Sequence, residues 1–598
     1  MKTISCDIAI IGGSMGGVSA QLSALASSAP VDRPLQVIVT EVSAWIGGQM
    51  TAQGVSALDE HEHIEHFGGT ARYSALREAI REHYRQQYNR PQLMRHDTVN
   101  GDHMPFNPGN GWVSRLCFLP RVALTVLEAW VADVYLLETY PVRAEVNEDR
   151  IRAVIVENAQ GEQTRISARY FLDATDTGDL LPLTGTAYVT GAESQAMTGE
   201  PNAPVDYRPQ EVQAFTYPFA VEYRAGEDHT IDKPEGYEQF QDRQPYTLHP
   251  INRAGERLIY LVFADNEAQG LMPFWTYRRL HHGALLGGTD ITMINWGSND
   301  YDRGDILSAD APTRAHYLDE AKRLSLGFLY WLQTECPRDD GGTGYPEFKL
   351  RPDVMGTTDG LSQAPYIRES RRIVPLRRVV EQDIIVTHND GARARPMRDS
   401  VGLGWYAMDL HACVGNQQSH LYAATRPFQV PLGALIPQHT QNLLASCKNI
   451  GTTHLTNGAY RLHPIEWGIG EAAGIIAAFC LRHDCTPHQL AQDDRLIWRL
   501  QYQLVRQGCP IFWAVDVAPE HPLFIATQLL LVQDVIVRDS PRWHRLTIGI
   551  DEALGASIDI TRLQQLADQL QIHPSLHADL TWGALCAQYS AGLRAQLA

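Results

Sequence analysis

A glycine-rich turn near the N-terminus has the residue types that bind a pyrophosphate group. It follows the apolar run Ile8–Ile11 in a G-x-S-x-x-G register, and its residues are Gly12, Gly13, Ser14, Met15, Gly16 and Gly17. A strand that turns directly into a helix presents free backbone N–H groups and the positive end of the helix dipole to an anion. The next expected strand, 35–41, ends on Glu41, whose carboxylate is placed to accept hydrogen bonds from an adenosine ribose. A chance glycine turn in an α/β enzyme is the alternative, but the turn together with Glu41 predicts a dinucleotide site.

Two later segments have the same small-residue character and are expected to meet the glycine turn in one site. The first begins at Asp173, where a short expected strand over 170–173 ends, and continues through Ala174 to Asp179. The second covers 442–478, where a strand-like run over 442–447 leads into an expected helix over 466–481 that is rich in glycine and alanine. The N-terminus of such a helix stabilises negative charge on a ligand.

An arginine cluster is a candidate for substrate binding. Arg368, Arg371 and Arg372 lie within five residues of one another and flank Glu369. A guanidinium group can hold a substrate carboxylate through two parallel hydrogen bonds. A structural ion-pair network around Glu369 is an equal alternative.

Arg461 and His463 come just before the last expected helix, at a position suited to catalysis. A histidine there can move a proton because its pKa lies near neutrality. Hydrogen-bond support of the ligand loop is the alternative role for His463. We predict that His463, Arg461 and Arg368 are catalytic residues.

A histidine-rich loop raises the question of a metal site. His61, His63 and His66 stand among four acidic residues, and imidazole and carboxylate groups are good metal ligands. Nothing in the spacing fixes a coordination geometry, so a polar loop over the active site is favoured. No metal is predicted.

Composition restricts the class of protein. The chain has 598 residues, is 44% hydrophobic and 20% charged, and carries a formal net charge of −19. This charge argues against nucleic acid or an anionic membrane as a partner. The nine cysteines are mostly isolated, which is typical of reduced packing residues. We expect a cytoplasmic protein with a small-molecule substrate, no membrane span and no export signal, while the oligomeric state stays open.

Taken in order, these segments resemble the FAD-dependent oxidoreductases of the glutathione-reductase-like superfamily, and in particular a bacterial family that begins with a GG-small-x-GG turn. The segments that carry the resemblance are Asp7–Gly17, Ile46–Thr51, Phe171–Asp179, Tyr366–Arg372, Pro431–Pro437 and Asn442–Ala478. Two positions depart from the family pattern: Ser14 replaces the middle glycine, and Asp176 stands where glycine is usual.

The resemblance implies FAD bound in an extended form across a Rossmann-like domain. The cofactor-binding residues that it implies are Gly12, Gly13, Ser14, Gly16, Gly17, Glu41, Gly48, Gln49, Asp173, Ala174, Asp179, Gly451, Gly470 and Glu471. The expected fold class is α/β, with an FAD-binding domain in two parts (1–190 and 416–490), an inserted mixed α+β substrate domain (191–415) and a helical C-terminal module (500–598). The tail, over 512–529 and 560–565, resembles a degenerate S-layer homology repeat.

The function that follows is oxidation of a small organic substrate by hydride transfer to the flavin, with an unknown electron acceptor. No second complete glycine fingerprint for NAD(P)H is visible, which favours reduction of the flavin by substrate. One alternative is a non-redox flavoenzyme, such as an isomerase or a lyase. Another is a binding or assembly protein that retains a vestigial FAD.

Overall fold

A mostly parallel sheet forms the centre of the fold. The computed structural model describes residues 1–27, 33–88, 97–99, 102–131, 135–252, 255–416 and 421–597. The sheet has seven strands in the order β5-β2-β1-β8-β7-β6, and β21 pairs with β8 beside this path. Its strands are β1 (Lys2–Ile11), β2 (Val37–Thr40), β5 (Tyr135–Leu136), β6 (Thr139–Asn147), β7 (Arg150–Asn158), β8 (Gln163–Asp173) and β21 (Leu443–Ala445).

The pairing of these strands explains their sequence patterns. β1 runs parallel to β2 and β8, and β21 also runs parallel to β8, whereas β6 and β7 form an antiparallel edge. A parallel strand that is covered on both faces buries every side chain, and all of Ile8–Ile11 are fully buried. The fold is therefore of the mixed α/β class with a Rossmann-like sheet.

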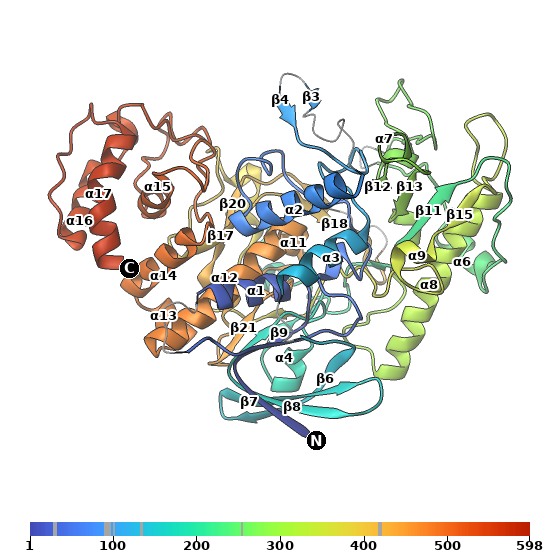
Figure 1. Ribbon diagram of the computed structural model, residues 1–598, viewed down its shortest axis with the longest axis horizontal. Helices are drawn as coiled ribbons and strands as arrows, with labels where there is room; N and C mark the ends of the chain where they lie inside the picture. Colours follow the sequence, from blue (N-terminus) through green and yellow to red (C-terminus); the bar gives the residue numbers. More distant parts are fainter. Residues whose placement is uncertain are drawn as a thin grey trace.

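Two helices that are distant in sequence pack closely beside this sheet. α1 (Met15–Ala26) follows β1 directly, and α12 (His463–His483) lies alongside it in the middle of the molecule (Figure 1). A Cβ atom added to Gly470 would lie 2.1 Å from the Gly16 carbonyl oxygen, and one added to Gly474 would lie 2.2 Å from that of Ala20. The absence of side chains at these glycines therefore lets the two helix backbones touch.

The middle of the chain forms a second layer at the right of Figure 1. Its four-stranded antiparallel sheet has the order β12-β13-β11-β15, and the long helix α8 (Ala311–Thr334) packs its apolar side chains into the same buried cluster. The strands are β11 (Phe219–Tyr223), β12 (Arg279–His281), β13 (Ile291–Ile294) and β15 (Phe348–Leu350).

Shorter elements connect these layers. The helices among them are α2 (Ala71–Tyr88), α3 (Pro120–Trp130), α4 (Leu180–Thr184), α5 (Gln195–Thr198), α6 (Tyr237–Arg243), α7 (Gly283–Leu286), α9 (Pro352–Met355), α10 (Glu381–Ile384), α11 (His454–Tyr460) and α13 (Pro487–Ala491). The strands form antiparallel pairs: β3 (Asp97–Val99) with β4 (Asp102–Met104), β9 (Tyr188–Val189) with β16 (Arg372–Ile373), β10 (Phe215–Thr216) with β14 (Asp300–Tyr301), β17 (Ser400–Gly404) with β20 (Phe428–Pro431), and β18 (Met408–Leu410) with β19 (Leu421–Ala423).

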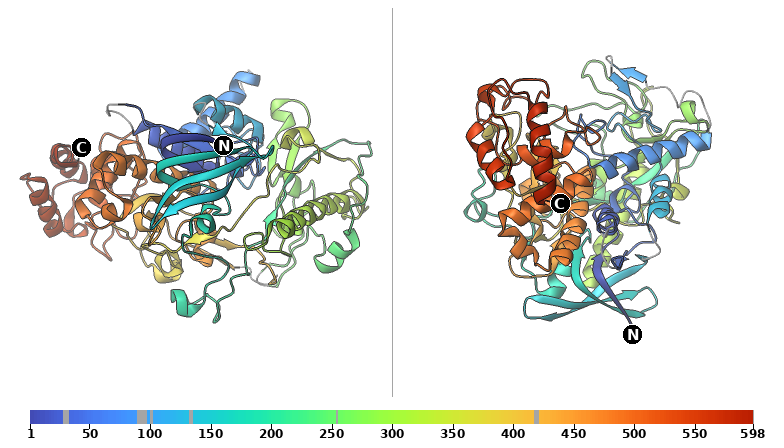
Figure 2. Two further views of the ribbon diagram at one scale, coloured as in Figure 1. Left: turned by 90° about the horizontal axis from the view of Figure 1, so that it is seen from below. Right: turned by 60° about the vertical axis from the view of Figure 1, so that its left-hand side comes forward.

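The C-terminal segment is helical and is firmly joined to the rest of the protein. It contains α14 (Asp494–Arg506), α15 (Phe524–Leu531), α16 (Ile560–Leu570) and α17 (Trp582–Leu597), at one end of the molecule in both views of Figure 2. Its buried residues, including Trp513 and Trp582, belong to the same hydrophobic cluster as Ile8–Ile11. The Arg393 Nε atom also donates to the Trp513 carbonyl oxygen at 2.7 Å. Removal of this segment would therefore expose part of the central core.

One helix in the described part of the chain, α12, is long and apolar enough to cross a membrane. However, 89% of its apolar window is buried inside the protein. Such burial is typical of a core helix.

Candidate functional site

The glycine turn is held in a conformation that only glycine adopts easily. Gly12 has φ = +106°, and a Cβ atom there would lie 2.2 Å from the Ala174 carbonyl oxygen. A Cβ atom on Gly17 would lie 2.0 Å from the Gly12 carbonyl oxygen, and one on Gly16 would lie 1.9 Å from that of Ser446. Ser14 caps α1 by accepting a hydrogen bond from the Gly17 N–H at 3.2 Å. These glycines are thus required by the fold itself, so a folded Gly12 variant cannot be assumed when cofactor binding is tested.

Glu41 lies directly against the turn, where the sequence predicts a ribose-binding carboxylate. Its Oε2 atom accepts the Gly13 N–H at 2.7 Å, and its Oε1 atom accepts the Ser43 N–H at 2.9 Å and the Ser43 hydroxyl at 2.8 Å. Burial raises the pKa of the Glu41 carboxyl to about 7, in spite of these hydrogen bonds. A carboxylate accepts about four hydrogen bonds, so one more position is open to a ligand hydroxyl.

We expect Glu41→Ala to weaken FAD binding by about 10- to 100-fold, because a hydrogen bond to a charged group contributes roughly 1.5–3 kcal/mol. The rate of flavin reduction at saturating FAD should not change. The wild-type affinity should also fall as the pH drops below about 7, since a hydroxyl donates more strongly to the ionised carboxylate. Glu41→Gln, which cannot ionise, should show a flatter pH profile. Fluorescence titration of the FAD-free protein measures both effects, and an unchanged dissociation constant in Glu41→Ala would remove Glu41 from the site.

The loop that contains Gly48 and Gln49 lies on the glycine turn. The Gly47 N–H donates to the Gly13 carbonyl oxygen at 2.7 Å, and a Cβ atom on Gly48 would lie 3.0 Å from the Ser14 Cα atom. The Gln49 side chain is fully buried, and its Nε2 atom donates to the Arg461 carbonyl oxygen at 2.9 Å and to the Glu466 carboxylate. Its Oε1 atom is buried without a hydrogen-bond partner among the described residues. This loop therefore connects the glycine turn to Arg461.

The small-residue segment 173–179 contacts the other side of the turn. The Ala174 N–H donates to the Ile11 carbonyl oxygen at 2.8 Å. Asp173 accepts the Thr175 N–H at 3.1 Å and the Leu180 N–H at 3.2 Å, so its carboxylate organises its own loop. Burial raises the pKa of the Asp173 carboxyl to about 7. Asp179 lies farther along the loop, 3.0 Å from Arg371.

A buried lysine lies where the three segments meet. Lys448 is 2% exposed, and its ammonium group pairs with Asp176 and, at 3.1 Å, with Glu466. Within the described residues, Asp176, Cys447 and Glu466 form the one group of three whose potential metal-ligand atoms lie within 4.8 Å of one another. The Lys448 ammonium group is bonded to two of these three residues, so an ion-pair cluster explains them without a metal. Sequence reasoning missed Lys448.

In the segment 442–478, the predicted cofactor-binding residues mainly make packing and anchoring contacts. Gly470 faces Gly16 across the α1–α12 contact, and a Cβ atom on Gly451 would lie 2.3 Å from the Pro375 side chain. Glu471 bonds the Thr70 hydroxyl at 2.6 Å and Arg72 at 2.7 Å, so it anchors the start of α2. The structure thus gives these three residues packing or anchoring contacts, and their role toward the cofactor stays a prediction.

A cavity of about 400 Å³ opens next to Arg461 and is lined by charged and aromatic side chains. Among the lining residues are two of the three predicted catalytic residues, Arg368 and Arg461. The cavity is also lined by Asp59, Tyr277, Arg278, Trp296, Tyr366, Tyr406, Asp409 and His411. A concave site with a few convergent polar groups is typical of a small-molecule site.

His411 on the cavity wall has the geometry of a proton acceptor. It follows β18, its side chain is 29% exposed, and its Nδ1 atom lies 2.7 Å from Asp300 Oδ2. Interactions with Arg368 and His411 hold the pKa of Asp300 well below its usual range in spite of burial, so the carboxylate accepts and Nδ1 carries the proton. In the neutral ring, Nε2 is then the atom without a proton, and it lies 3.7 Å from Asp409 Oδ2. The sequence gives only weak evidence that His411 belongs to a site. Asp409 and His411 are two residues apart, so they lie on the same side of an extended segment.

His463, by contrast, is not one of the residues that line the cavity. Its Nδ1 atom accepts the Asp59 N–H at 3.1 Å, and its Nε2 atom donates to the Val55 carbonyl oxygen at 3.0 Å. Burial lowers its pKa, and the side chain is fully buried. These contacts favour the supporting role, in which His463 holds the loop that presents Asp59 to the cavity.

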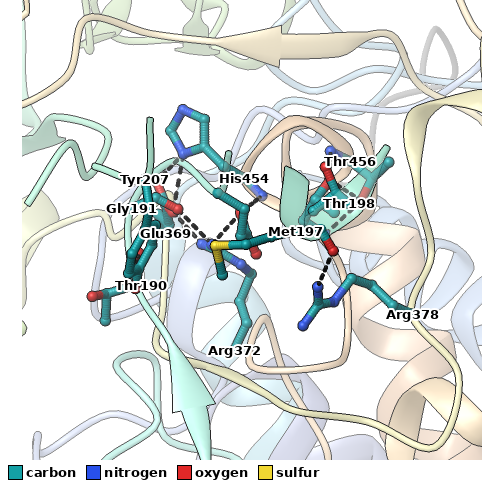
Figure 3. Close-up of polar contacts among 12 residues, drawn as sticks. Thr190, Gly191, Met197, Thr198, Tyr207, Glu369, Arg372, Arg378, His454 and Thr456 are labelled. Carbon is teal, nitrogen blue, oxygen red and sulfur yellow. Dashed lines mark hydrogen bonds and ion pairs between the residues drawn. The ribbon is translucent and has the colours of Figure 1, made fainter. Parts of the chain in front are cut away.

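The arginine cluster separates in the structure. Arg368 lines the cavity, Arg371 bonds Asp179, and Arg372 bonds Glu369 and, at 3.1 Å, Glu193. Figure 3 shows that Arg372 and His454 both reach Glu369, and the His454 Nδ1 atom lies 3.0 Å from it. In spite of burial, these two cations lower the pKa of Glu369 to about 2. Arg372 therefore belongs to an ion-pair network around Glu369, as in the alternative interpretation, whereas Arg371 pairs separately with Asp179.

The histidine-rich loop packs against tryptophans. His61 contacts the rings of Trp405 and Trp513, with centroids 6.0 and 5.2 Å away, and His63 stacks on Trp405. Burial lowers the pKa of His61 to about 3. Through His61 and Trp513, the loop thus contacts the C-terminal segment.

Comparison with known proteins gives one extensive match. Residues 7–504 match the family described as FAD dependent oxidoreductase. No curated protein matches the chain by sequence. The match ends before most of the C-terminal segment, and no comparison supports the S-layer likeness there.

Solved structures resemble parts of the chain. An L-proline dehydrogenase from P. horikoshii is 16% identical over 32% of this chain and 24% of its own, with a TM-score of 0.16. A flavin monooxygenase from Stenotrophomonas maltophilia is 17% identical over 33% and 44%, with a TM-score of 0.16. The rebeccamycin biosynthetic enzyme RebC is 11% identical over 54% and 49%, with a TM-score of 0.23. The chain thus spans less than half of each of these proteins.

Proposed function

Because the chain belongs to the family of FAD-dependent oxidoreductases, we propose that it oxidises a small organic substrate bound in the cavity beside Arg461, with FAD as the oxidant. When bound, FAD accepts a hydride equivalent from the substrate. The electron acceptor that reoxidises it stays open.

The residues at the turn fit this cofactor. The α1 N-terminus, the positive φ of Gly12 and the open acceptor position on Glu41 suit the pyrophosphate and the ribose of a dinucleotide. Next to the same turn, the buried Lys448 ammonium group is paired with Asp176 and Glu466, and Glu466 accepts the Gly16 N–H at 3.3 Å. We propose that Gly13, Ser14 and Glu41 hold the adenosine side, while Gly48 and Gln49 lie toward the flavin.

One observation carries the proposal: the cofactor loop and the cavity share Arg461. The Gln49 side chain bonds the Arg461 backbone at 2.9 Å, and the Arg461 guanidinium group lines the cavity. A substrate in the cavity is therefore separated from the cofactor loop by a single residue.

Proton removal from the substrate falls to His411 in this proposal. Asp300 fixes the ring so that Nε2 can accept the proton, and Arg368 holds Asp300 at 2.9 Å. His463 is then a positioning residue that holds Asp59.

The finer architecture follows the same proposal. Two stretches, 1–190 and 416–490, make a glutathione-reductase-like FAD-binding domain, 191–415 is an inserted mixed α+β substrate domain, and 500–598 is a helical module. A packing or assembly role of the tail, a cytoplasmic location and the absence of nucleic-acid and membrane partners remain proposals.

Anaerobic mixing of the FAD-loaded protein with pools of metabolites tests the function. A pool that contains the substrate should bleach the flavin absorbance near ~450 nm, because the cofactor carries the visible redox signal. Conversion of a compound with the oxidised spectrum intact would support the alternative, a non-redox isomerase or lyase. An FAD-loaded protein with no turnover at all would favour an assembly protein that retains FAD.

A further inference from the structure

Three buried arginines line the cavity, and they are not all closely paired with carboxylates. Arg278, Arg368 and Arg461 are 7%, 2% and 3% exposed, and two lining carboxylates, Asp59 and Asp409, face them. Burial of a charged group is costly unless it is paired and hydrogen-bonded. The pairing of each arginine therefore shows which of them is available to a ligand.

Arg368 is closely paired by the protein, although its Nε atom has no hydrogen-bond partner among the described residues. It lies 2.9 Å from Asp300, and its NH1 atom donates to the Ala214 carbonyl oxygen at 2.8 Å and to the Thr216 hydroxyl at 2.9 Å. These are ordinary lengths for charge-assisted hydrogen bonds. Arg368 therefore holds Asp300, which in turn orients His411.

Arg278 and Arg461 are paired only loosely. The nearest carboxylate oxygen lies 3.4 Å from Arg278, on Asp59, and 3.8 Å from Arg461, on Asp409. Both distances exceed the ~2.7–2.9 Å of a strong N⁺–H···O⁻ contact. Asp59 interacts electrostatically with both guanidinium groups, as Tyr366 and Tyr406 do, so the two arginines share one part of the wall.

Each of these two arginines also has unused donors. Arg461 donates to the Tyr366 hydroxyl at 2.9 Å and to the Asp409 carbonyl oxygen at 3.2 Å. Arg278 donates to the Ala57 carbonyl oxygen at 3.2 Å and to Asp59. A guanidinium group has five N–H donors, so each uses two of them within the described part of the chain.

We infer that the substrate is a carboxylate whose anionic group binds between Arg278 and Arg461. This inference rests on the proposed function and names the substrate class of the same site. Asp59 and Asp409 lie beside these two arginines, so a group with one negative charge meets less repulsion there than a doubly charged phosphate. Tyr277, Tyr406 and Trp296 provide flat apolar surfaces for the rest of an organic acid in a cavity of about 400 Å³.

A matched pair of probes tests the inference without turnover. Benzoate and benzamide have the same shape and differ in charge, and each is titrated into oxidised FAD-loaded protein. Binding is followed by perturbation of the flavin spectrum and by the shift in melting temperature. Benzoate should bind at least about tenfold more tightly, as expected for a charged hydrogen-bond partner in a buried site.

Variants locate the anionic site. Arg461→Met and Arg278→Met should each weaken benzoate by about tenfold or more and leave benzamide unchanged. Arg461→Lys keeps the charge but loses the planar pair of N–H donors, so its affinity for benzoate should lie between those of wild type and Arg461→Met. Arg150→Met, beside a separate surface cavity, is the control and should match wild type.

Equal affinity for the two probes, binding of neither, or full benzoate affinity in both methionine variants would overturn the inference. Its failure is distinguishable from failure of the proposed function. If only the inference is wrong, an uncharged compound bleaches the flavin and carboxylate selectivity is absent. If only the proposed oxidoreductase function is wrong, carboxylate selectivity remains and no substrate bleaches the flavin.

Discussion

His411→Asn is expected to slow reduction of the flavin by substrate at least about 100-fold, because loss of a general base commonly costs 10²- to 10⁴-fold in rate. Asparagine can keep a hydrogen bond to Asp300 but cannot accept a proton at neutral pH. FAD content should not change, since His411 lies on the cavity wall and not at the glycine turn. Rapid mixing under anaerobic conditions measures the rate directly.

His463 provides the contrast for this experiment. His463→Asn replaces a fully buried ring whose two nitrogens bond the backbone of residues 55–59. It should lower stability or raise the half-saturating substrate concentration, while the limiting reduction rate stays within about tenfold of wild type. A wild-type rate in His411→Asn together with a 100-fold loss in His463→Asn would return the proton-transfer role to His463.

Gly470→Ala is expected to destabilise the protein strongly. The new Cβ atom would lie 2.1 Å from the Gly16 carbonyl oxygen, so α1 and α12 would have to move apart beneath the glycine turn. Overpacking of a core typically costs about 1–3 kcal/mol, and more where the obstructing atom is backbone. We therefore expect a lower melting temperature and weaker FAD retention.

Gly468→Ala on the same helix is the matched control. Apart from the adjacent residues and backbone of α12 itself, no atom lies within 4 Å of a Cβ atom built there, so alanine should be neutral or should stabilise by up to about 1 kcal/mol through helix propensity. Thermal unfolding of both variants compares the two sites. Equal melting temperatures would show that the α1–α12 contact is not as close as described.

The parts of the site that are local in sequence could be predicted. The apolar run Ile8–Ile11, the small residues after it and the acid at Glu41 follow one another along one strand–turn–helix unit, and the structure places them together. The short strand expected over 170–173 also exists, although β8 begins earlier, at Gln163. Such units have a regular backbone geometry, so their sequence pattern can be recognised.

Contacts between distant residues could not be predicted in the same way. His411 and Asp300 are 111 residues apart, and no periodicity in the sequence connects them. Lys448 likewise looked unremarkable until Asp176 and Glu466 surrounded it. Single polar residues acquire a role only when the fold supplies their partners.

Glycines and arginines left the prediction incomplete for different reasons. Glycine in a helix indicates a close approach but does not say to what, and at Gly470 the neighbour is the backbone of α1. Arg368, Arg371 and Arg372 are close in sequence, yet the irregular backbone points them at Asp300, Asp179 and Glu369. Proximity in sequence therefore did not give a common target.

Anaerobic titration of the FAD-loaded protein with its substrate tests the central claim most directly. If the chain oxidises a substrate bound beside the flavin, one equivalent of substrate should reduce one equivalent of FAD, and the absorbance near ~450 nm should disappear in proportion. Product formation while the oxidised spectrum persists throughout the titration would contradict this account.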